Sequence, residues 1–356
     1  MRILAWPIRT PWNPYAGMVF SNLPGVEVDG WPANLLRKYS VWHMHWPDSL
    51  LNIVNTPLAV YKVSGMLATM DFLRLRGTKM VWTMHNFASH EARHPELERW
   101  FWRRFVPRVD GVISLSTTGL TKALQRFPRF QDIPTAVIPH GHYREEYPQA
   151  TVDSRQALGI PRQAKVVMFF GAVRAYKNVE VLVRAFRNVS RADALLYIVG
   201  NPNTEELTQR IVKEASQDRR VSLKFQFVDP KEVAMYLGAA DLVVLPYREV
   251  LNSGSALLAL SCNRPVLVPD LGAMGELKAD FSEMWVRTFR GELNESILEA
   301  ALEWASQSRP SVCAMPERYE WAHIGSETIE FYKKVISGSL AGSESARYAA
   351  AGDRSP

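Results

Sequence analysis

Short apolar segments alternate with helical patterns along almost the whole chain, and this alternation restricts the possible folds more than any other feature of the sequence. It is typical of βαβ units, which build parallel sheets covered by helices. The predicted strands form two groups: 3–6, 41–45, 80–83, 111–115 and 136–138, then 166–170, 195–199, 223–227, 242–245, 266–268 and 284–286. We therefore predict an α/β protein with two doubly wound, Rossmann-like halves.

A chain of 356 residues is longer than one hydrophobic core usually supports, which agrees with two domains. The segment 144–164 is rich in turn formers and charge and separates the halves. We place the first domain at 1–145, the second at 146–315, and a helix that packs back toward the first domain at 316–337. Residues 338–356 are small and polar, and we expect them to be disordered.

The two cysteines, Cys262 and Cys313, are too few for a disulfide framework. No apolar run approaches the roughly 18 residues that span a bilayer. The N-terminus has only a short apolar run before Pro7 and is not typical of a signal peptide. We expect a reducing, cytoplasmic location.

The net charge of +6 is concentrated in the first half. Residues 1–150 hold 17 Lys and Arg against 11 Asp and Glu, so the remainder holds 25 against 25. Such an excess indicates a negatively charged partner, either nucleic acid or an anionic membrane. Zinc-finger spacings, glycine-rich RNA-binding signatures and Lys/Arg blocks are missing, which favours the membrane and disfavours nucleic acid.

The segment 97–108, LERWFWRRFVPR, interleaves aromatic and basic side chains. A surface that carries Trp100, Trp102, Arg103 and Arg104 can lie on an anionic leaflet, with its rings in the interface and its guanidinium groups on phosphates. The alternative is an exposed helix held by salt bridges. We expect peripheral binding to the inner face of the cell membrane.

The stretch 166–178, VVMFFGAVRAYKN, predicts a buried strand that ends at Gly171 and leads past Arg174 and Lys177 into a helix. Free N–H groups, the positive end of the helix dipole and two cations converge at such a turn, which makes it a candidate anion site. An ordinary βα turn with solvated cations is the alternative.

A second turn of this kind opens the helical run ALLALS, with Asn252, Ser253, Gly254 and Ser255 at its start. Ser253 is a natural N-cap, and the glycine lets a phosphate approach closely. A plain capped helix is the alternative, but two such turns together fit a diphosphate. No G-x-G-x-x-G follows either first strand, and Gly17 comes late in its loop, so a dinucleotide cofactor has weak support.

Seven of the eight histidines lie in the first half. Residues 90–94 spell H-E-A-R-H, a zinc-protease pattern that requires both imidazoles on one helical face. Pro95 follows at once and favours a helix that starts at Pro95, which disfavours a zinc site. We expect no metal.

His85 lies at the end of a predicted strand, where α/β sheets bind ligands. An imidazole with an ordinary pKa near 6.5 can accept a proton from an attacking hydroxyl there. A histidine whose hydrogen bonds are satisfied at a strand end is the alternative.

Several stretches together resemble the GT-B nucleotide-sugar glycosyltransferases, especially bacterial exopolysaccharide enzymes. Those similar to the donor domain are FFGAVRAYKNVEVLVRAF, LYIVGNP, FVDPKEVAMYLGAADLVVLPY and NSGSALLALSCNRPVLVPDLGAMGEL. Those similar to the acceptor domain are VWHMHWPD, MVWTMHNFASHE and VIPHGHY. The resemblance covers about residues 1–336 and implies two Rossmann-like domains with an interdomain cleft.

The resemblance implies that Arg174 and Lys177 grip the donor pyrophosphate and stabilise the leaving nucleoside diphosphate. It places the nucleobase edge at Val228 and Asp229. The full donor-binding set is Gly17, Gly171, Val228, Asp229, Asn252, Ser253, Gly254 and Ser255. Because cations and helix termini meet the pyrophosphate, we expect neither a metal nor another cofactor.

The resemblance also implies that His85, in a T-x-H-N stretch, touches the donor sugar or the acceptor. Asp48 and Glu91 are candidate carboxylate bases if the reaction inverts the anomeric centre. Sugars stack on indole rings, so Trp12 and Trp46 are candidates for the acceptor cleft, with a place in the core as the alternative. His45 and His140 are further candidates, with histidines whose hydrogen bonds are satisfied as the alternative.

One departure from the large retaining families concerns two glutamates separated by seven residues. At those positions this chain has Val250 and Leu258, and Glu249 fits only the first role. This favours a divergent family such as the inverting β-mannosyltransferases of xanthan-type assembly, which the chain also resembles.

We therefore expect an exopolysaccharide glycosyltransferase that uses a nucleoside-diphosphate sugar, with GDP-mannose as the donor, and a lipid-linked oligosaccharide acceptor. The alternatives are a nucleotide-sugar 2-epimerase of the same fold and a non-catalytic protein that binds sugar nucleotides.

Overall fold

The structure is a computed structural model that describes residues 1–10, 13–32, 35–87, 93–148 and 152–339. The chain forms two compact units. The first contains residues 1–141 and the chain from 317 onward, and the second contains residues 142–316.

The first unit is built on a parallel sheet with the strand order β2-β1-β3-β4-β5-β6. Its strands are β1 (Arg2–Trp6), β2 (Glu27–Gly30), β3 (Val41–His45), β4 (Lys79–Met84), β5 (Gly111–Ser114) and β6 (Thr135–Val137). The five strands predicted for this half are confirmed to within one or two residues. The sixth, β2, was missed because its sequence, EVDG, forms a partly exposed edge with one apolar side chain.

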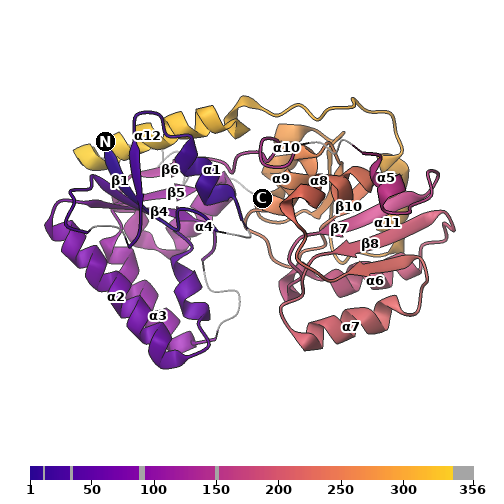
Figure 1. Ribbon diagram of the computed structural model, residues 1–356, viewed down its shortest axis with the longest axis horizontal. Coiled ribbons are helices and arrows are strands. Elements are labelled where there is room, and N and C mark those ends of the chain that lie inside the picture. The colour runs from indigo at the N-terminus through magenta and orange to yellow at the C-terminus, as the bar shows by residue number, and fades with distance from the viewer. Residues whose placement is uncertain (11–12, 33–34, 88–92, 149–151, 340–356) are drawn as a thin grey trace. The chain divides into compact units, whose positions relative to one another are not determined.

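Helices cover both faces of this sheet. The helices are α1 (Tyr15–Ser21), α2 (Thr56–Leu75), α3 (Pro95–Phe105), α4 (Thr117–Arg126) and α12 (Trp321–Ser337), and the 3-10 turns are η1 (Pro47–Asn52), η2 (Val106–Arg108), η3 (Pro128–Asp132) and η5 (Glu317–Tyr319). Figure 1 shows α2 and α3 side by side on one face of the sheet and α12 on the other. Helix α3 begins at Pro95, as predicted.

The core beneath α2 and α3 is strongly aromatic and includes Trp42, Trp82, Phe101 and Phe105. Trp102 belongs to this core, because its ring lies 5.3 Å from that of Trp82 and its residue is 6% exposed. The prediction that Trp102 faces a membrane is therefore wrong. Its position on α3 points toward the sheet, whereas Arg103 and Arg104 are exposed.

Helix α12 closes the first unit although it is last in the sequence. The Tyr332 hydroxyl lies 2.6 Å from His43 Nδ1, and His43 Nε2 lies 2.7 Å from Thr83 Oγ1 on β4. Close packing also requires glycine at two places: a Cβ on Gly111 would come 2.5 Å from Val335, and one on Gly141 would come 2.4 Å from the Trp321 indole.

The second unit contains a parallel sheet with the order β12-β11-β10-β7-β8-β9. Its strands are β7 (Lys165–Phe170), β8 (Ala194–Val199), β9 (Val221–Lys224), β10 (Leu242–Val244), β11 (Val266–Pro269) and β12 (Val286–Phe289). Four predicted strands are confirmed, whereas β9 ends three residues early and β12 starts two residues late. The aromatic and apolar residues after Lys224 form a loop instead of a strand end.

The remaining helices lie on both faces of the second sheet. They are α5 (Ser154–Ala157), α6 (Val179–Arg187), α7 (Glu205–Ala215), α8 (Pro230–Ala239), α9 (Gly254–Ser261), α10 (Met274–Phe281) and α11 (Glu295–Ala305), together with the 3-10 turn η4 (Ala175–Lys177). Figure 1 shows α6 and α7 on one face and α8, α9 and α10 on the other.

Each sheet has a point at which the strand order reverses, and such points are where open α/β sheets bind ligands, outside the carboxyl ends of the strands. In the second unit the order reverses between β7 and β10. In the first unit it reverses between β1 and β3. The loops after these four strands are therefore the places to look for chemistry.

Over the described residues, none of the helices combines the length and hydrophobicity that a bilayer-spanning segment needs.

Candidate active site

The strand β7 ends in a turn that only glycine can make. Gly171 has a φ of +128°, and Gly200, at the end of the neighbouring strand β8, has a φ of +147°. A Cβ on Gly200 would lie 1.9 Å from the Gly171 carbonyl oxygen. The backbones of the two strand ends therefore approach so closely that a side chain at Gly200 would clash.

Three predicted residues meet at this turn. A Cβ built on Gly171 would lie 2.8 Å from Ser255 Oγ and 3.6 Å from Lys177 Nζ. Ser255 comes from the first turn of α9, which follows β10, and Lys177 comes from η4, which follows β7. The strand-order reversal thus brings together a hydroxyl, an ammonium group and a helix N-terminus, the components of an anion site.

The start of α9 is ordered as predicted. Ser253 is its N-cap, and its Oγ accepts a hydrogen bond from the Ala256 N–H at 3.1 Å. Ser253 Oγ also donates to the buried Tyr247 hydroxyl at 3.3 Å. The Tyr247 ring lies 5.6 Å from Lys177 Nζ, so its face supports the ammonium group. Sequence reasoning missed this tyrosine, since its position depends on tertiary packing.

Arg174 lies beside the same turn. Its Nη1 donates to the carbonyl oxygens of Val173 at 2.8 Å and Asn201 at 3.1 Å. These bonds fix the guanidinium at the carboxyl ends of β7 and β8. The loop after β10 is tied to the same place, because the Arg248 N–H donates to the Tyr176 carbonyl at 2.8 Å.

Burial, and then the nearby charge of Arg174, lower the pKa of Lys177 to about 8. Within the part of the chain that the structure describes, no carboxylate forms an ion pair with Lys177. An anion that binds here therefore relieves the repulsion between two cations.

We expect the affinity of the protein for inorganic pyrophosphate to fall as the pH rises above about 8, because Lys177 then loses its proton. Above about pH 8, Lys177 is deprotonated in the free protein but still protonated in the complex. Over that range the Kd for pyrophosphate should increase about tenfold per pH unit. Isothermal titration calorimetry measures this. Lys177→Arg is the matched control, since its guanidinium stays charged and should flatten the profile. If the Kd of this variant depended on pH as steeply as that of the wild type, Lys177 would not be the group that binds the pyrophosphate.

Two amide side chains flank the turn with buried atoms that have no hydrogen-bond partner among the described residues: Asn178 Oδ1 and Asn252 Nδ2. Asn178 is 7% exposed and adopts a left-handed conformation, with φ +57°, directly before α6. Buried polar atoms are usually paired, so both amides are candidates for ligand contact. Asn252 was predicted, whereas Asn178 was missed.

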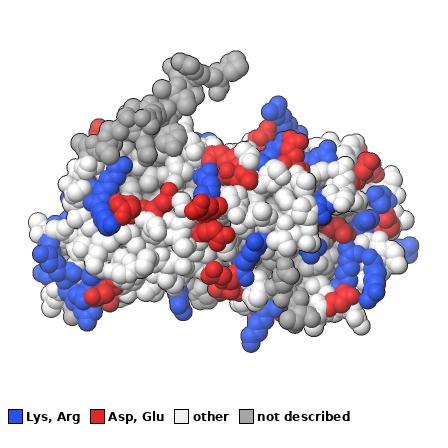
Figure 2. Space-filling view, turned by 90° about the horizontal axis from the view of Figure 1, so that it is seen from above, with Lys and Arg blue, Asp and Glu red and all other residues white. Residues whose placement is uncertain are grey.

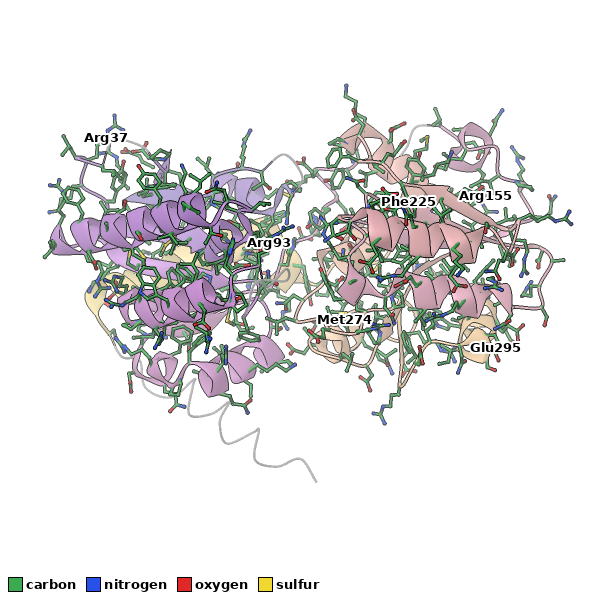
Figure 3. The ribbon with its side chains drawn as sticks, turned by 90° about the horizontal axis from the view of Figure 1, so that it is seen from below. Arg37, Arg93, Arg155, Phe225, Met274 and Glu295 are labelled. Carbon is green, nitrogen blue, oxygen red and sulfur yellow. The ribbon has the colours of Figure 1, made fainter. Side chains whose placement is uncertain are left out.

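The predicted nucleobase residues lie beyond β9. Val228 is buried, and Asp229 caps α8 by accepting a hydrogen bond from the Lys231 N–H at 2.9 Å. Two aromatic side chains of this loop are accessible: Phe227 is 60% exposed, and Phe225, labelled in Figure 3, is partly exposed. Stacking on a ring is an available way to hold a base here.

The first unit gathers aromatic and histidine side chains at the carboxyl ends of its strands. Tyr15 forms the centre, with ring distances of 5.5 Å to His45, 5.0 Å to His85 and 4.3 Å to His140. Trp46 stacks on His85 at 4.2 Å. His45 Nδ1 lies 3.1 Å from His85 Nε2. Four of the predicted residues are thus in one cluster.

The expectation of an ordinary pKa at His85 is wrong. Burial, and then the proximity of His140 and His43, lower its pKa well below the usual range. Burial has the same effect on His45, and it lowers the pKa of His140 to about 4. A neutral imidazole of this kind orients a hydroxyl by hydrogen bonding but is a weak base.

Asp48, one of the two predicted carboxylate bases, has a pKa close to neutral pH. It lies in η1, two residues after Trp46, and is 5% exposed. Burial raises its pKa to about 7, while its own backbone N–H and the Asn86 side chain hydrogen-bond to it. Because Asn86 directly follows His85, these bonds join the loops after β3 and β4.

The other predicted positions have mixed outcomes. Gly17 lies on α1, where a Cβ would come 3.2 Å from the side chain of Arg9, an exposed cation after β1. Trp12 and Glu91 lie outside the described residues, as does most of the H-E-A-R-H segment. His94 precedes α3 with non-helical angles, and its Nε2 lies 2.7 Å from the Ile53 carbonyl. Among the described residues, no three His, Cys, Asp or Glu side chains are grouped as metal ligands.

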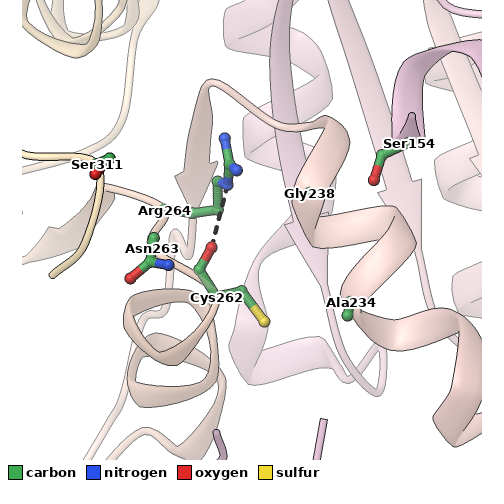
Figure 4. Close-up of a pocket in the computed structure, with 7 residues that line it drawn as sticks. All are labelled: Ser154, Ala234, Gly238, Cys262, Asn263, Arg264 and Ser311. Carbon is green, nitrogen blue, oxygen red and sulfur yellow. Dashed lines mark hydrogen bonds between the residues drawn. The ribbon is translucent and has the colours of Figure 1, made fainter. Parts of the chain in front are cut away.

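A separate cavity of about 190 Å³ opens in the second unit (Figure 4). It is lined by Ser154, Ala234, Gly238, Cys262, Asn263, Arg264 and Ser311. Arg264 donates to the Cys262 carbonyl at 3.2 Å, and burial raises the pKa of the Cys262 thiol to about 11. Arg264 precedes β11, so this cavity lies at the amino edge of the sheet, away from the anion turn.

Comparison with known proteins agrees with this geometry. The family described as glycosyl transferases group 1 matches residues 164–301, which include the anion turn and α9. The GDP-mannose:glycolipid 4-beta-D-mannosyltransferase of Xanthomonas campestris pv. campestris is 31% identical over 331 residues, or 91% of this chain and 89% of that protein.

Among solved structures, the Anabaena protein HepE in complex with UDP and glucose has a TM-score of 0.63 at 17% identity, over 95% of this chain and 98% of that one. Sucrose-phosphate synthase from Thermosynechococcus elongatus has a TM-score of 0.62 at 18% identity, over 85% of this chain and 75% of that one. At such identities the likeness shows the fold. With a relative that is 31% identical along nearly the whole chain, the protein belongs to the group 1 glycosyltransferases of GT-B fold and is related to the xanthan-type mannosyltransferases.

Proposed function

We propose that the protein transfers mannose from GDP-mannose to a hydroxyl of a lipid-linked oligosaccharide in exopolysaccharide biosynthesis. The name of the Xanthomonas relative, a GDP-mannose:glycolipid mannosyltransferase, supports both substrates. The structural observation that carries the proposal is the anion turn, where Lys177, Ser255 and the start of α9 meet at Gly171.

In this proposal the second unit holds the donor. The pyrophosphate contacts Lys177 and the N–H groups at the start of α9, and Arg174 adds charge beside them. As the bond between the anomeric carbon and the phosphate oxygen breaks, negative charge grows on the pyrophosphate, and fixed cations stabilise it without reorganisation. These groups suffice for the leaving group, so we propose that no metal is required.

In this proposal the first unit binds the acceptor and positions its hydroxyl. The oxygen attacks the anomeric carbon, and its proton passes to the Asp48 carboxylate. His45 and His85 are neutral and orient the hydroxyl, while the indole of Trp46 offers a face to a sugar ring. A carboxylate base suits inversion at the anomeric carbon, and the Xanthomonas relative is named a 4-beta-D-mannosyltransferase.

The test is a donor and acceptor assay with the purified protein. GDP-, UDP-, ADP- and dTDP-sugars are first compared by thermal shift, where a donor at about 100 times its Kd stabilises the native state by about 2.7 kcal/mol. Radiolabelled GDP-mannose is then incubated with lipid-linked oligosaccharides, and label is counted in the organic phase. We expect transfer of label that depends on the acceptor.

Two results would redirect the proposal. Stabilisation by a different nucleotide sugar would replace GDP-mannose as the donor. Turnover of UDP-N-acetylglucosamine without any acceptor would instead identify an epimerase.

We further propose that the protein reaches its acceptor by peripheral binding to the cytoplasmic face of the membrane.

A further inference from the structure

Helix α2 carries large apolar side chains on both of its faces. Its inner face packs in the core through Ala59, Val63, Met66, Leu67, Met70 and Leu73. On its outer face, Tyr61 is 71% exposed, Phe72 is 41% exposed and Leu75 is 90% exposed. Ala68 is also exposed and continues the same line, since positions 61, 68, 72 and 75 share one side of an α-helix. A surface helix normally carries polar side chains there.

Exposed apolar side chains also occur next to the helix at both ends. Val54, just before α2, is 75% exposed, and Leu58 in its first turn is 44% exposed. At the other end, Leu36 is 75% exposed, and Arg76 Nη2 donates to its carbonyl oxygen at 2.7 Å. Several exposed apolar side chains grouped along one element are typical of an interaction site.

Basic side chains border the outer face of α2. Asp71 is its one acidic residue, and Arg108 neutralises it with hydrogen bonds of 2.8 and 2.7 Å. Arg108 also donates to the Arg104 carbonyl at 2.6 Å, which places the end of α3 next to α2. Arg76 lies over the Phe72 ring at 5.5 Å.

Three further cations, Lys62, Arg103 and Arg104, are exposed. Among the described residues, none of the ion pairs involves these three side chains. Figure 3 shows this side of the first unit, whereas Figure 2 shows the opposite side, where acidic and basic side chains are mixed.

We propose that the outer face of α2, together with the basic end of α3, is the surface that docks on an anionic lipid bilayer. Tyr61, Phe72 and Leu75 insert among the headgroups, and the surrounding cations contact lipid phosphates. This differs from a surface centred on Trp102, which is buried. The inference rests on the proposed function only in that a lipid-linked acceptor gives membrane docking its purpose.

Charge favours a bilayer over a second copy of this chain as the occupant. In a two-fold dimer the same surface meets itself, so Arg76, Arg104 and Lys62 of both copies would be brought together. An anionic leaflet instead offers the opposite charge over the whole border.

Flotation with vesicles of phosphatidylcholine, with and without phosphatidylglycerol, tests the proposal. Wild-type protein should float with the anionic vesicles. The double variant Phe72→Ser, Leu75→Ser should bind at least about tenfold more weakly, because two apolar side chains no longer leave water. Arg103→Gln, Arg104→Gln should lose only the part of the binding that depends on phosphatidylglycerol and on low salt. Circular dichroism confirms that each variant is folded.

The matched control is Val212→Ser, Val312→Ser, which removes apolar side chains that are 44% and 52% exposed on the second unit. It should bind like the wild type. Equal binding by the Phe72, Leu75 double variant would overturn the proposal. So would a wild-type dimer that this variant dissociates without any change in vesicle binding. The assay contains neither donor nor acceptor, so its failure leaves glycosyl transfer untouched, and loss of transfer leaves the vesicle result standing.

Discussion

Replacing Lys177 by alanine is expected to lower kcat/KM for sugar transfer by about 10²–10³-fold, the usual cost of removing one fixed group that stabilises developing negative charge. Lys177 Nζ lies at the Gly171 turn together with Ser255 Oγ. Because its pKa is lowered to about 8, a leaving pyrophosphate that forms beside it strengthens its hold on the proton. Initial rates with saturating acceptor and varied GDP-mannose measure the effect.

The stability of the Lys177→Ala variant should not fall, since removing a half-buried cation next to Arg174 relieves repulsion. A matched control is Lys165→Ala, at the opposite end of β7. It should keep its activity. If Lys177→Ala transfers sugar at a normal rate while Lys165→Ala does not, the donor site has been assigned to the wrong end of the sheet.

Replacing Asp48 by asparagine is expected to have opposite effects on activity and on stability. Loss of the base should lower kcat by about 10²–10⁴-fold. The free energy of unfolding should rise at pH 8, because the folded protein no longer has to hold a buried carboxylate charge. The pKa shift from 3.8 to about 7, at about 1.4 kcal/mol per unit, sets an upper limit of about 4 kcal/mol.

The size of the stability effect depends on pH. Between about pH 4 and pH 7 the folded protein holds a proton on Asp48 that the unfolded chain has released. Ionisation of Asp48 therefore destabilises the wild type progressively as the pH rises through this window, and the asparagine variant lacks this contribution. Urea titrations at pH 4, 6 and 8 should show the two proteins diverging.

Asn86→Ala is the companion variant, since it removes a hydrogen bond to Asp48 and keeps the carboxylate. It should retain most of the activity. An Asp48→Asn variant that is stabilised yet fully active would show that the buried carboxylate is structural and that another group accepts the proton.

Local features of this protein could be predicted from the sequence because each depends on a few neighbouring residues. Ser253 caps α9 by accepting a hydrogen bond from the N–H of Ala256, three residues later. Pro95 starts α3 because proline has no N–H, and the first residue of a helix does not need one. The strand β7 is an apolar run after Lys165, as expected in a parallel sheet, and β3 is buried throughout although it contains two histidines. These local patterns therefore predict the same local structure that the folded protein has.

Features that depend on tertiary packing could not be predicted. The pKa values of His85 and Asp48 follow from burial, and the residues next to them in the sequence do not reveal how deeply they are buried. The position of Tyr247 behind Lys177 depends on the strand order. The composition of α3 alone does not predict the position of Trp102, because the helical period places Trp102 on the buried side and Arg103 and Arg104 on the exposed side.

The place of α12 has a consequence for how the protein is made on the ribosome. The core of the first unit combines the beginning and the end of the chain, because Tyr332 hydrogen-bonds His43 and Trp321 packs on Gly141. The second unit, residues 142–316, is one uninterrupted segment that is synthesised before α12 emerges. Domains usually fold in the order in which they are synthesised. Here we expect the reverse: the unit that begins the chain waits, with the buried surface of β3 and β4 uncovered, until the last helix arrives.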